Sequence, residues 1–164
     1  IVFQELREVR ALAYAVGARY LPGDRKEDKN IMLGVIQTQA DKTIEAIQAF
    51  TDLMDNLPLT EERYAFARNA LLSDYRSNRI GFRAVPGTIL DWDLRGLEPD
   101  PRRLWYDEIV KAEDMTLMAD FHKTYIAGKP KLISVVGDTS RIDMDTLQKL
   151  GKFKEVTVDE VFVK

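Results

Sequence analysis

An arginine and a tyrosine near the start of the chain are the first residues whose types and spacing could serve chemistry. Arg7 and Tyr14 are seven residues apart, which is close to two turns of an α-helix, so both could face one side. A structural interpretation is also open, in which Arg7 pairs with a nearby glutamate and Tyr14 lies at the edge of the core. We expect Tyr14 to stand where a helix gives way to a strand.

The single histidine, His122, is a weaker candidate for a catalytic residue than Arg7 and Tyr14. It follows Phe121 on a predicted helix, and no acid or second histidine stands at ligand spacing. Catalytic zinc sites need several imidazole, thiolate or carboxylate ligands, and the chain has no cysteine. We therefore interpret His122 as a structural or surface residue. The same lack of cysteine excludes a disulfide framework and a cysteine nucleophile.

Several other patterns resemble functional motifs but have simpler explanations. Gly137-Asp138-Thr139-Ser140 follows an apolar segment, yet it lacks the repeated glycines and the lysine of a phosphate-binding loop. We expect a turn in which Asp138 or Ser140 binds backbone amides. Asp138, Asp143 and Asp145 lack the spacing and the terminal glutamate of an EF-hand. No G-x-S-x-G motif of a serine hydrolase is present.

Charge and hydropathy exclude two further classes of partner. The 164-residue chain has a net charge of −3, so we expect no nucleic-acid partner. A local basic run is best explained as a solvated helix face with ion pairs; it comprises Arg63, Arg68, Arg76, Arg79 and Arg83. No apolar stretch approaches the roughly 18 residues of a membrane span. The compartment stays open.

The first forty residues predict a helix followed by a β-hairpin. Apolar residues recur every three or four positions over residues 2–11, which indicates an amphipathic helix. Residues 13–20 alternate as in a strand. A turn rich in proline, glycine and charge occupies residues 22–30, and residues 31–39 form the second strand. We expect the two strands to pair antiparallel.

The rest of the sequence predicts helices and then two further strands. Thr60 is a good N-cap, followed by two glutamates at the positive end of the helix dipole. The expected helices cover residues 42–57, 61–79, 86–94, 115–126 and 143–150, with Asp41 before the first of them and Asp114 as a cap of the fourth. A loop is expected at 98–102 and strands at 131–136 and 153–158. Residues 105–109 are ambiguous. Because strands and helices are partly segregated, we predict one α+β domain over residues 1–164, with a two-layer antiparallel sheet packed against helices.

The order of several short motifs resembles the insulinase (pitrilysin) family of zinc metallopeptidases. The chain is similar to the later half of such an enzyme, which does not bind zinc. The motifs run through nearly the whole chain and are Phe3-Gln4-Glu5-Leu6-Arg7-Glu8, Leu12-Ala13-Tyr14-Ala15-Val16-Gly17-Ala18, Asp41-Lys42-Thr43-Ile44-Glu45-Ala46-Ile47, Leu57-Pro58-Leu59-Thr60-Glu61, Gly128-Lys129-Pro130, Ser134-Val135-Val136-Gly137-Asp138 and Leu150-Gly151. Their consistent order is more specific than any one of them.

The resemblance implies a function for the arginine and the tyrosine. In this family two α+β halves close around a chamber, and the earlier half binds zinc through an H-x-x-E-H motif that is absent here. The later half supplies an arginine and a tyrosine seven apart, which match Arg7 and Tyr14. Arg7 would then grip the substrate backbone, and Tyr14 would donate to the carbonyl oxygen as it becomes an oxyanion. The expected partners are a peptide substrate and a zinc-bearing half, in the same chain or in a partner subunit.

The chain also departs from the family pattern. It starts at Ile1 without methionine, reads as helix from its first residues and lacks the opening strands of the later half. We therefore expect a fragment truncated at its N-terminus, inactive alone and without a cofactor of its own. Two alternatives stay open. One is a catalytically silent partner subunit with a structural or interaction role, and the other is an unrelated α+β ligand-binding domain.

Overall fold

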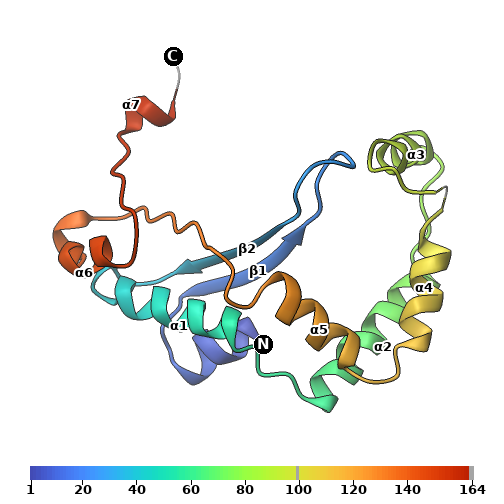
Figure 1. Ribbon diagram of the computed structural model, residues 1–164, viewed down its shortest axis with the longest axis horizontal. Coiled ribbons are helices and arrows are strands. Elements are labelled where there is room, and N and C mark those ends of the chain that lie inside the picture. Colours follow the sequence, from blue (N-terminus) through green and yellow to red (C-terminus); the bar gives the residue numbers. More distant parts are fainter. Residues whose placement is uncertain (99, 163–164) are drawn as a thin grey trace. The chain divides into compact units, whose positions relative to one another are not determined.

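The predicted hairpin and most of the predicted helices are present in the computed structural model, which describes residues 1–98 and 100–162 (Figure 1). The described elements are, in chain order, η1 Gln4–Val9, β1 Ala15–Leu21, β2 Ile31–Gln37, η2 Ala40–Lys42, α1 Thr43–Asp55, α2 Glu61–Ser77, α3 Val85–Leu94, α4 Arg102–Lys111, α5 Thr116–Tyr125, η3 Thr139–Arg141, α6 Met144–Lys149 and α7 Val158–Val161. The ambiguous residues 105–109 lie within α4. In the predicted loop at 98–102, Arg102 already begins α4, and Pro99 lies outside the described residues.

Strands β1 and β2 form an antiparallel two-stranded sheet, as the alternation predicted. The connection between them is held by side chains that bind the backbone. Asn30 Oδ1 accepts from the Gly23 amide at 2.9 Å, and Asp28 Oδ2 accepts from the Arg25 amide at 3.0 Å. A Cβ at Gly23 would lie only 2.5 Å from Cβ of Asp28, so this position needs glycine.

Local capping explains where several helices begin and end. Thr60 is the N-cap of α2, and its side chain accepts from the Arg63 amide at 3.2 Å, which confirms the prediction. The C-terminal end of α5 is followed by Gly128 at φ +67°, a left-handed position that favours glycine. Pro86 lies in the first turn of α3, where its missing amide hydrogen costs no hydrogen bond.

The predicted strands at 131–136 and 153–158 are wrong for the part of the chain that the structure describes. Residues 131–136 are irregular, and Leu132 and Val136 are each 98% exposed. β-propensity alone does not make a strand, because the backbone must also pair with a neighbouring strand. Residues 153–157 are irregular too, and Val158 begins α7. There the carboxylate of Glu160 accepts from the Thr157 amide at 2.9 Å, as in a helix capping box.

The chain divides into two compact units, each described here by itself. The first comprises Ile1–Gly17, Ile36–Thr51 and the described part of Lys131–Lys164. Its buried side chains come from η1, the segment between η1 and β1, α1 and the segment before α6; they are Leu6, Leu12, Ala13, Thr43, Ala46, Ala49 and Ile142. In this unit η2 contacts η3, so the start of α1 is packed against the segment that precedes α6.

The second unit comprises Ala18–Val35 and Asp52–Pro130. Helices α2 and α4 pack together in it, and two side chains of α2 bind the C-terminal carbonyls of α4. The Tyr64 hydroxyl donates to the Ala112 carbonyl at 2.8 Å, and Arg68 donates to the carbonyls of Ile109 and Val110 at 3.0 and 2.7 Å. Arginine at a helix C-terminus satisfies otherwise unpaired carbonyls and suits the helix dipole.

The prediction that the chain combines helices and strands is therefore confirmed. A sheet larger than the two strands β1 and β2 is not present among the described residues. The prediction of one domain over residues 1–164 stays a prediction. None of the described helices is long and apolar enough to cross a lipid bilayer.

Candidate functional site

Arg7 and Tyr14 lie on either side of a tightly built junction between η1 and β1. Segment η1 is a π-helix that ends at Val9. After it, Ala11 has a φ of +50°, in the left-handed region that residues other than glycine rarely adopt. The Leu12 amide then donates to the Leu6 carbonyl at 3.0 Å, which closes the end of the helix.

The residues after the turn are fastened to the end of β2. The Tyr14 amide donates to the Gln37 carbonyl at 2.8 Å, and the Thr38 hydroxyl donates to the Leu12 carbonyl at 2.6 Å. Leu12 and Ala13 are buried between these two anchors. The backbone before and at Tyr14 is therefore held by both hydrogen bonds and apolar burial, which fixes the direction in which the chain enters β1.

Both candidate side chains are presented to solvent. Tyr14 is 84% exposed, and the Arg7 guanidinium lies 4.8 Å from the centre of the Phe3 ring. Cation–π stacking of this kind restrains the guanidinium while leaving its N–H edge available. No described hydrogen bond joins Arg7 to Tyr14. The helical-spacing argument for a shared face is wrong, since the helix ends before Tyr14, but the expectation that Tyr14 stands at the helix-to-strand change is confirmed.

We expect Ala11→Gly to stabilise the junction. A left-handed non-glycine residue costs on the order of 1–3 kcal/mol, and the greater freedom of glycine in the unfolded chain removes part of that gain. The free energy of unfolding should therefore rise by about 0.5–1 kcal/mol in urea denaturation. The matched control is Ala13→Gly, which lies outside the left-handed region and should be destabilising. If both variants were destabilised alike, the strained turn at Ala11 would be contradicted.

His122 caps another helix. Its Nε2 lies 2.8 Å from the Met54 carbonyl, near the C-terminal end of α1. Because a carbonyl only accepts, Nε2 carries the hydrogen and donates. The Gly128 amide donates to Asp55 Oδ1 at 2.8 Å, close by in the same unit. The interpretation of His122 as a structural residue therefore agrees with its contact.

Asp138 and Asp143 serve as turn and helix caps. Asp138 Oδ1 accepts from the Ser140 amide and hydroxyl at 3.1 and 2.6 Å, which confirms the predicted turn. Asp143 accepts from the Thr146 hydroxyl and amide at 2.7 and 3.0 Å at the start of α6. These hydrogen bonds hold the pKa of each carboxyl below its ordinary value of 3.8. Among the described residues, no group of three His, Cys, Asp or Glu could hold a metal ion.

The low pKa of Asp143 predicts a pH dependence of α6. A carboxyl with a depressed folded pKa stabilises the folded state above its unfolded pKa, and this contribution is lost as pH falls through the folded pKa. We therefore expect the Thr146 amide resonance in NMR to keep its capped shift at pH 5 and to lose it below pH 3.8. In Asp143→Asn, which still caps but does not titrate, that pH step should be absent. An identical step in both proteins would contradict the assignment.

Three arginines of the basic run bind neutral groups, and the solvated face with ion pairs stays a prediction for the run as a whole. Arg68 binds the carbonyls of α4, and Arg76 Nε donates to the Tyr106 hydroxyl at 3.0 Å. Arg83 lies over the ring of Phe82, with 4.8 Å between the guanidinium carbon and the ring centre. Sequence reasoning also missed a cavity that the run helps to line, beside α3 and the start of α4. The sequence feature that could have indicated this cavity is the presence of two tryptophans, Trp92 and Trp105, near arginines.

Comparison with known proteins identifies no relative. No protein-family model matches the sequence, and no curated protein or solved structure matches the chain. Assignment to the insulinase family therefore stays an inference from the ordered motifs and from the residues at the junction.

Proposed function

We propose that this chain is the later, non-zinc part of an insulinase-type metallopeptidase. It would complete the peptide-binding chamber and stabilise the substrate carbonyl while hydrolysis occurs in a zinc-bearing companion half. The observation that carries the proposal is the junction itself. An exposed phenol stands on backbone that is anchored to β2 on one side and to a buried helix end on the other. The anchored backbone fixes the point from which the phenol is presented, and a donor to a developing oxyanion needs a defined position.

The two side chains have separate roles in this proposal. The Tyr14 hydroxyl donates to the carbonyl oxygen of the scissile peptide as negative charge develops there. Arg7, held over the Phe3 ring, presents fixed N–H donors to the substrate backbone. Because both bind main-chain atoms, they place little demand on the substrate's side chains.

Zinc, when bound in the companion half, would supply the activation of the attacking water and the polarisation of the carbonyl. The described residues of this chain offer no ligand cluster for it, and the lone His122 is engaged with the Met54 carbonyl. This chain would form the side of the chamber opposite the metal. It would contribute the Tyr14 hydroxyl as a donor and Arg7 as a cation, and it would shield the scissile peptide bond from bulk water.

Reconstitution tests the proposal. This chain is co-expressed with a companion that carries the H-x-x-E-H motif, and cleavage of a quenched fluorogenic peptide is measured. We expect no cleavage by this chain alone, little by the companion alone and at least a hundredfold more by the two together. Equal activity of the companion with and without this chain would overturn the proposal.

A silent partner subunit is the second candidate, and the apolar exterior of the hairpin favours it. In β2 the side chains of Ile31, Leu33 and Val35 are all exposed, although such residues normally lie inside. In this case Arg7→Ala and Tyr14→Phe leave the activity of the assembly unchanged. Charged substitutions such as Leu33→Lys abolish assembly instead, as measured by size-exclusion chromatography.

A further inference from the structure

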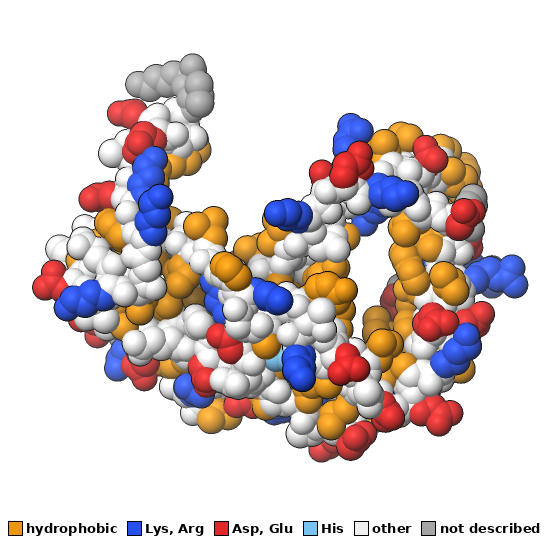
Figure 2. Space-filling model, viewed as in Figure 1, with side chains coloured by type: hydrophobic (Ala, Val, Ile, Leu, Met, Phe, Trp, Pro, Cys, Tyr) orange, Lys and Arg blue, Asp and Glu red, His pale blue; other side chains and the backbone are white. Residues whose placement is uncertain are grey.

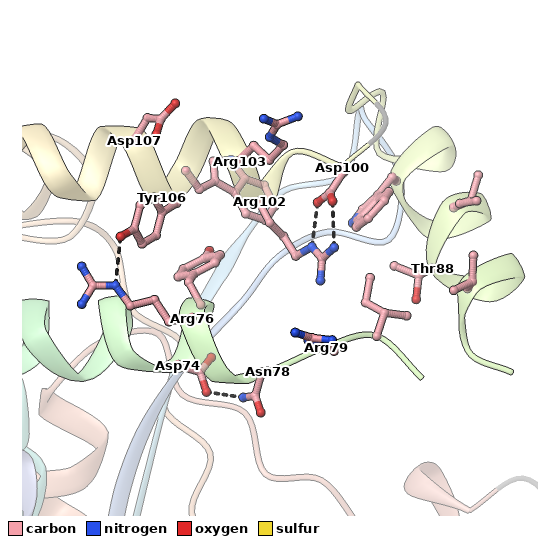
Figure 3. A pocket seen from close by; sticks show the side chains of 16 residues that line it. Asp74, Arg76, Asn78, Arg79, Thr88, Asp100, Arg102, Arg103, Tyr106 and Asp107 are labelled. Atoms are coloured by element: carbon pink, nitrogen blue, oxygen red, sulfur yellow. Dashed lines mark hydrogen bonds and ion pairs between the residues drawn. The ribbon is translucent and has the colours of Figure 1, made fainter. Parts of the chain in front are cut away.

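A cavity of about 1000 Å³ lies within the second unit, between the end of α2, helix α3 and the start of α4 (Figure 3). Its volume is at the upper end of ordinary ligand pockets, which run to about 1000 Å³. It shares no residue with the junction that carries Arg7 and Tyr14. A ligand bound there would therefore be held independently of the proposed peptidase role.

One wall of the cavity is an apolar stripe on α3. Val85, Ile89 and Trp92 line the cavity and are spaced by four and three residues, so they share one face of the helix. Val85 and Ile89 are exposed although they are large and hydrophobic. Figure 2 shows hydrophobic side chains at the surface over α3 and α4. An exposed stripe of this kind marks a surface that takes an apolar group.

Aromatic residues form the other wall. The rings of Tyr75 and Tyr106 meet edge to face at 6.5 Å between centres, and Trp105 follows on α4. Burial, and then the charge of Asp74, raises the pKa of Tyr75. Like any tyrosine hydroxyl at neutral pH, the Tyr75 hydroxyl is protonated and can donate a hydrogen bond. Rigid aromatic walls with polar tips suit a large apolar side chain of a ligand.

The arginines of the cavity differ in what they already bind. Arg102 donates to both carboxylate oxygens of Asp100 at 2.7 and 2.8 Å, and Arg76 donates to the Tyr106 hydroxyl. Arg79 and Arg103 make no side-chain hydrogen bond or ion pair with the described residues. In Figure 3, Arg79 reaches into the space below Arg102, and Arg103 lies on the opposite side of Arg102. Arg103 still lies near enough to Asp100 for its charge to help lower the pKa of that carboxyl, so Arg79 is the lining arginine with no partner among the described residues.

The carboxylates in the lining limit which anion fits. The lining holds three aspartates, Asp74, Asp100 and Asp107, against four arginines, so the net excess is a single positive charge. A polyphosphate would meet these carboxylates as like charges, which is unfavourable in a partly enclosed site. A single carboxylate satisfies one free guanidinium through a bidentate pair. The charge balance therefore favours a ligand with a single carboxylate over a nucleotide.

We propose that this cavity binds a peptide segment that carries one carboxylate and one aromatic or large aliphatic side chain. The carboxylate pairs with Arg79, and the apolar side chain lies between the α3 stripe and Trp105. Arg103, at the edge, steers the acidic ligand toward the site.

The intrinsic tryptophan fluorescence of the chain can report binding in this cavity, because both of its tryptophans, Trp92 and Trp105, line the cavity. Tryptophan fluorescence of the chain is titrated with four blocked, tryptophan-free hexapeptides: one with Phe and Glu, one with Phe and Gln, one with Ala and Glu, and one with Phe and Lys. ATP serves as the polyphosphate probe. We expect the Phe–Glu peptide to change the fluorescence saturably and to bind about tenfold more tightly than the Phe–Gln peptide.

Variants test which cation is responsible. Arg79→Gln should weaken the Phe–Glu peptide about tenfold and leave the Phe–Gln peptide unchanged, and Arg103→Gln should have a smaller effect that fades with salt. Arg19→Gln, an exposed arginine outside the cavity, is the control. Equal affinity for the Glu and Gln peptides, tighter binding of ATP, or no response to any peptide by a chain with unchanged circular dichroism would overturn the proposal.

Discussion

Tyr14→Phe should lower the turnover of the reconstituted peptidase about 10²–10³-fold, the usual effect of removing one oxyanion donor. The substitution deletes one hydroxyl and leaves the ring. Tyr14 is 84% exposed and its amide, not its hydroxyl, binds Gln37. The substitution should therefore leave the folded structure unchanged, and the expected loss of turnover is in the chemical step.

The kinetic pattern distinguishes this role from substrate binding. If Tyr14 acts only as the oxyanion forms, kcat and kcat/KM fall together while KM stays nearly constant. The matched control is Tyr125→Phe, another exposed tyrosine, on α5, which should keep wild-type turnover. Turnover of Tyr14→Phe within twofold of wild type would show that the oxyanion role is wrong.

Leu6→Ala should cost about 3 kcal/mol of the free energy of unfolding, in the middle of the range for fully buried leucines. Leu6 is completely buried, and its carbonyl accepts from the Leu12 amide to close the end of η1. The substitution leaves a cavity beneath the turn that precedes Tyr14. Urea denaturation followed by circular dichroism measures the effect.

The comparison for this variant is Leu117→Ala on α5. Leu117 is 63% exposed, so its truncation should change the stability by no more than about 0.5 kcal/mol. If Leu6→Ala were as mild as Leu117→Ala, the buried anchor beneath the junction would not exist as described. In the reconstituted enzyme, Leu6→Ala should also reduce turnover, because a loosened junction no longer holds the phenol in place.

Local signals in the sequence were enough to predict the hairpin and most helices. The alternation through Val16 and the turn at Gly23 depend on neighbours in sequence, and so does the N-cap at Thr60. Each is decided by a hydrogen bond or a side-chain pattern within a few residues. Such features can be deduced without knowing what the segment packs against.

Features that depend on distant partners could not be predicted in the same way. The apolar segment around Val135 has the composition of a strand, but a strand also needs a paired neighbour, and the described part of the chain supplies none. The left-handed Ala11 carries no sequence signal, because alanine rarely adopts that conformation.

The roles of Arg7 and Tyr14 stay predictions from the sequence. Arg7 and Tyr14 came from the ordered motifs, and the structure adds the anchored backbone between them. The cavity beside α3 was missed because Arg79 and Arg103 are 24 positions apart in the sequence. Only the return of the chain through α4 brings them to one cavity. Their neighbours in sequence suggested an ordinary charged helix face.

A crosslink measures directly where Tyr14 lies relative to the substrate. Tyr14 is replaced by p-benzoyl-phenylalanine, the chain is assembled with its zinc-bearing companion, and an uncleaved peptide is bound and irradiated. Mass spectrometry then locates the attachment. The proposal predicts a crosslink to the residues that flank the scissile bond, and the same replacement at Tyr125 should give none there. Attachment of the Tyr14 probe only to distant parts of the peptide, or to no peptide at all, would contradict the account.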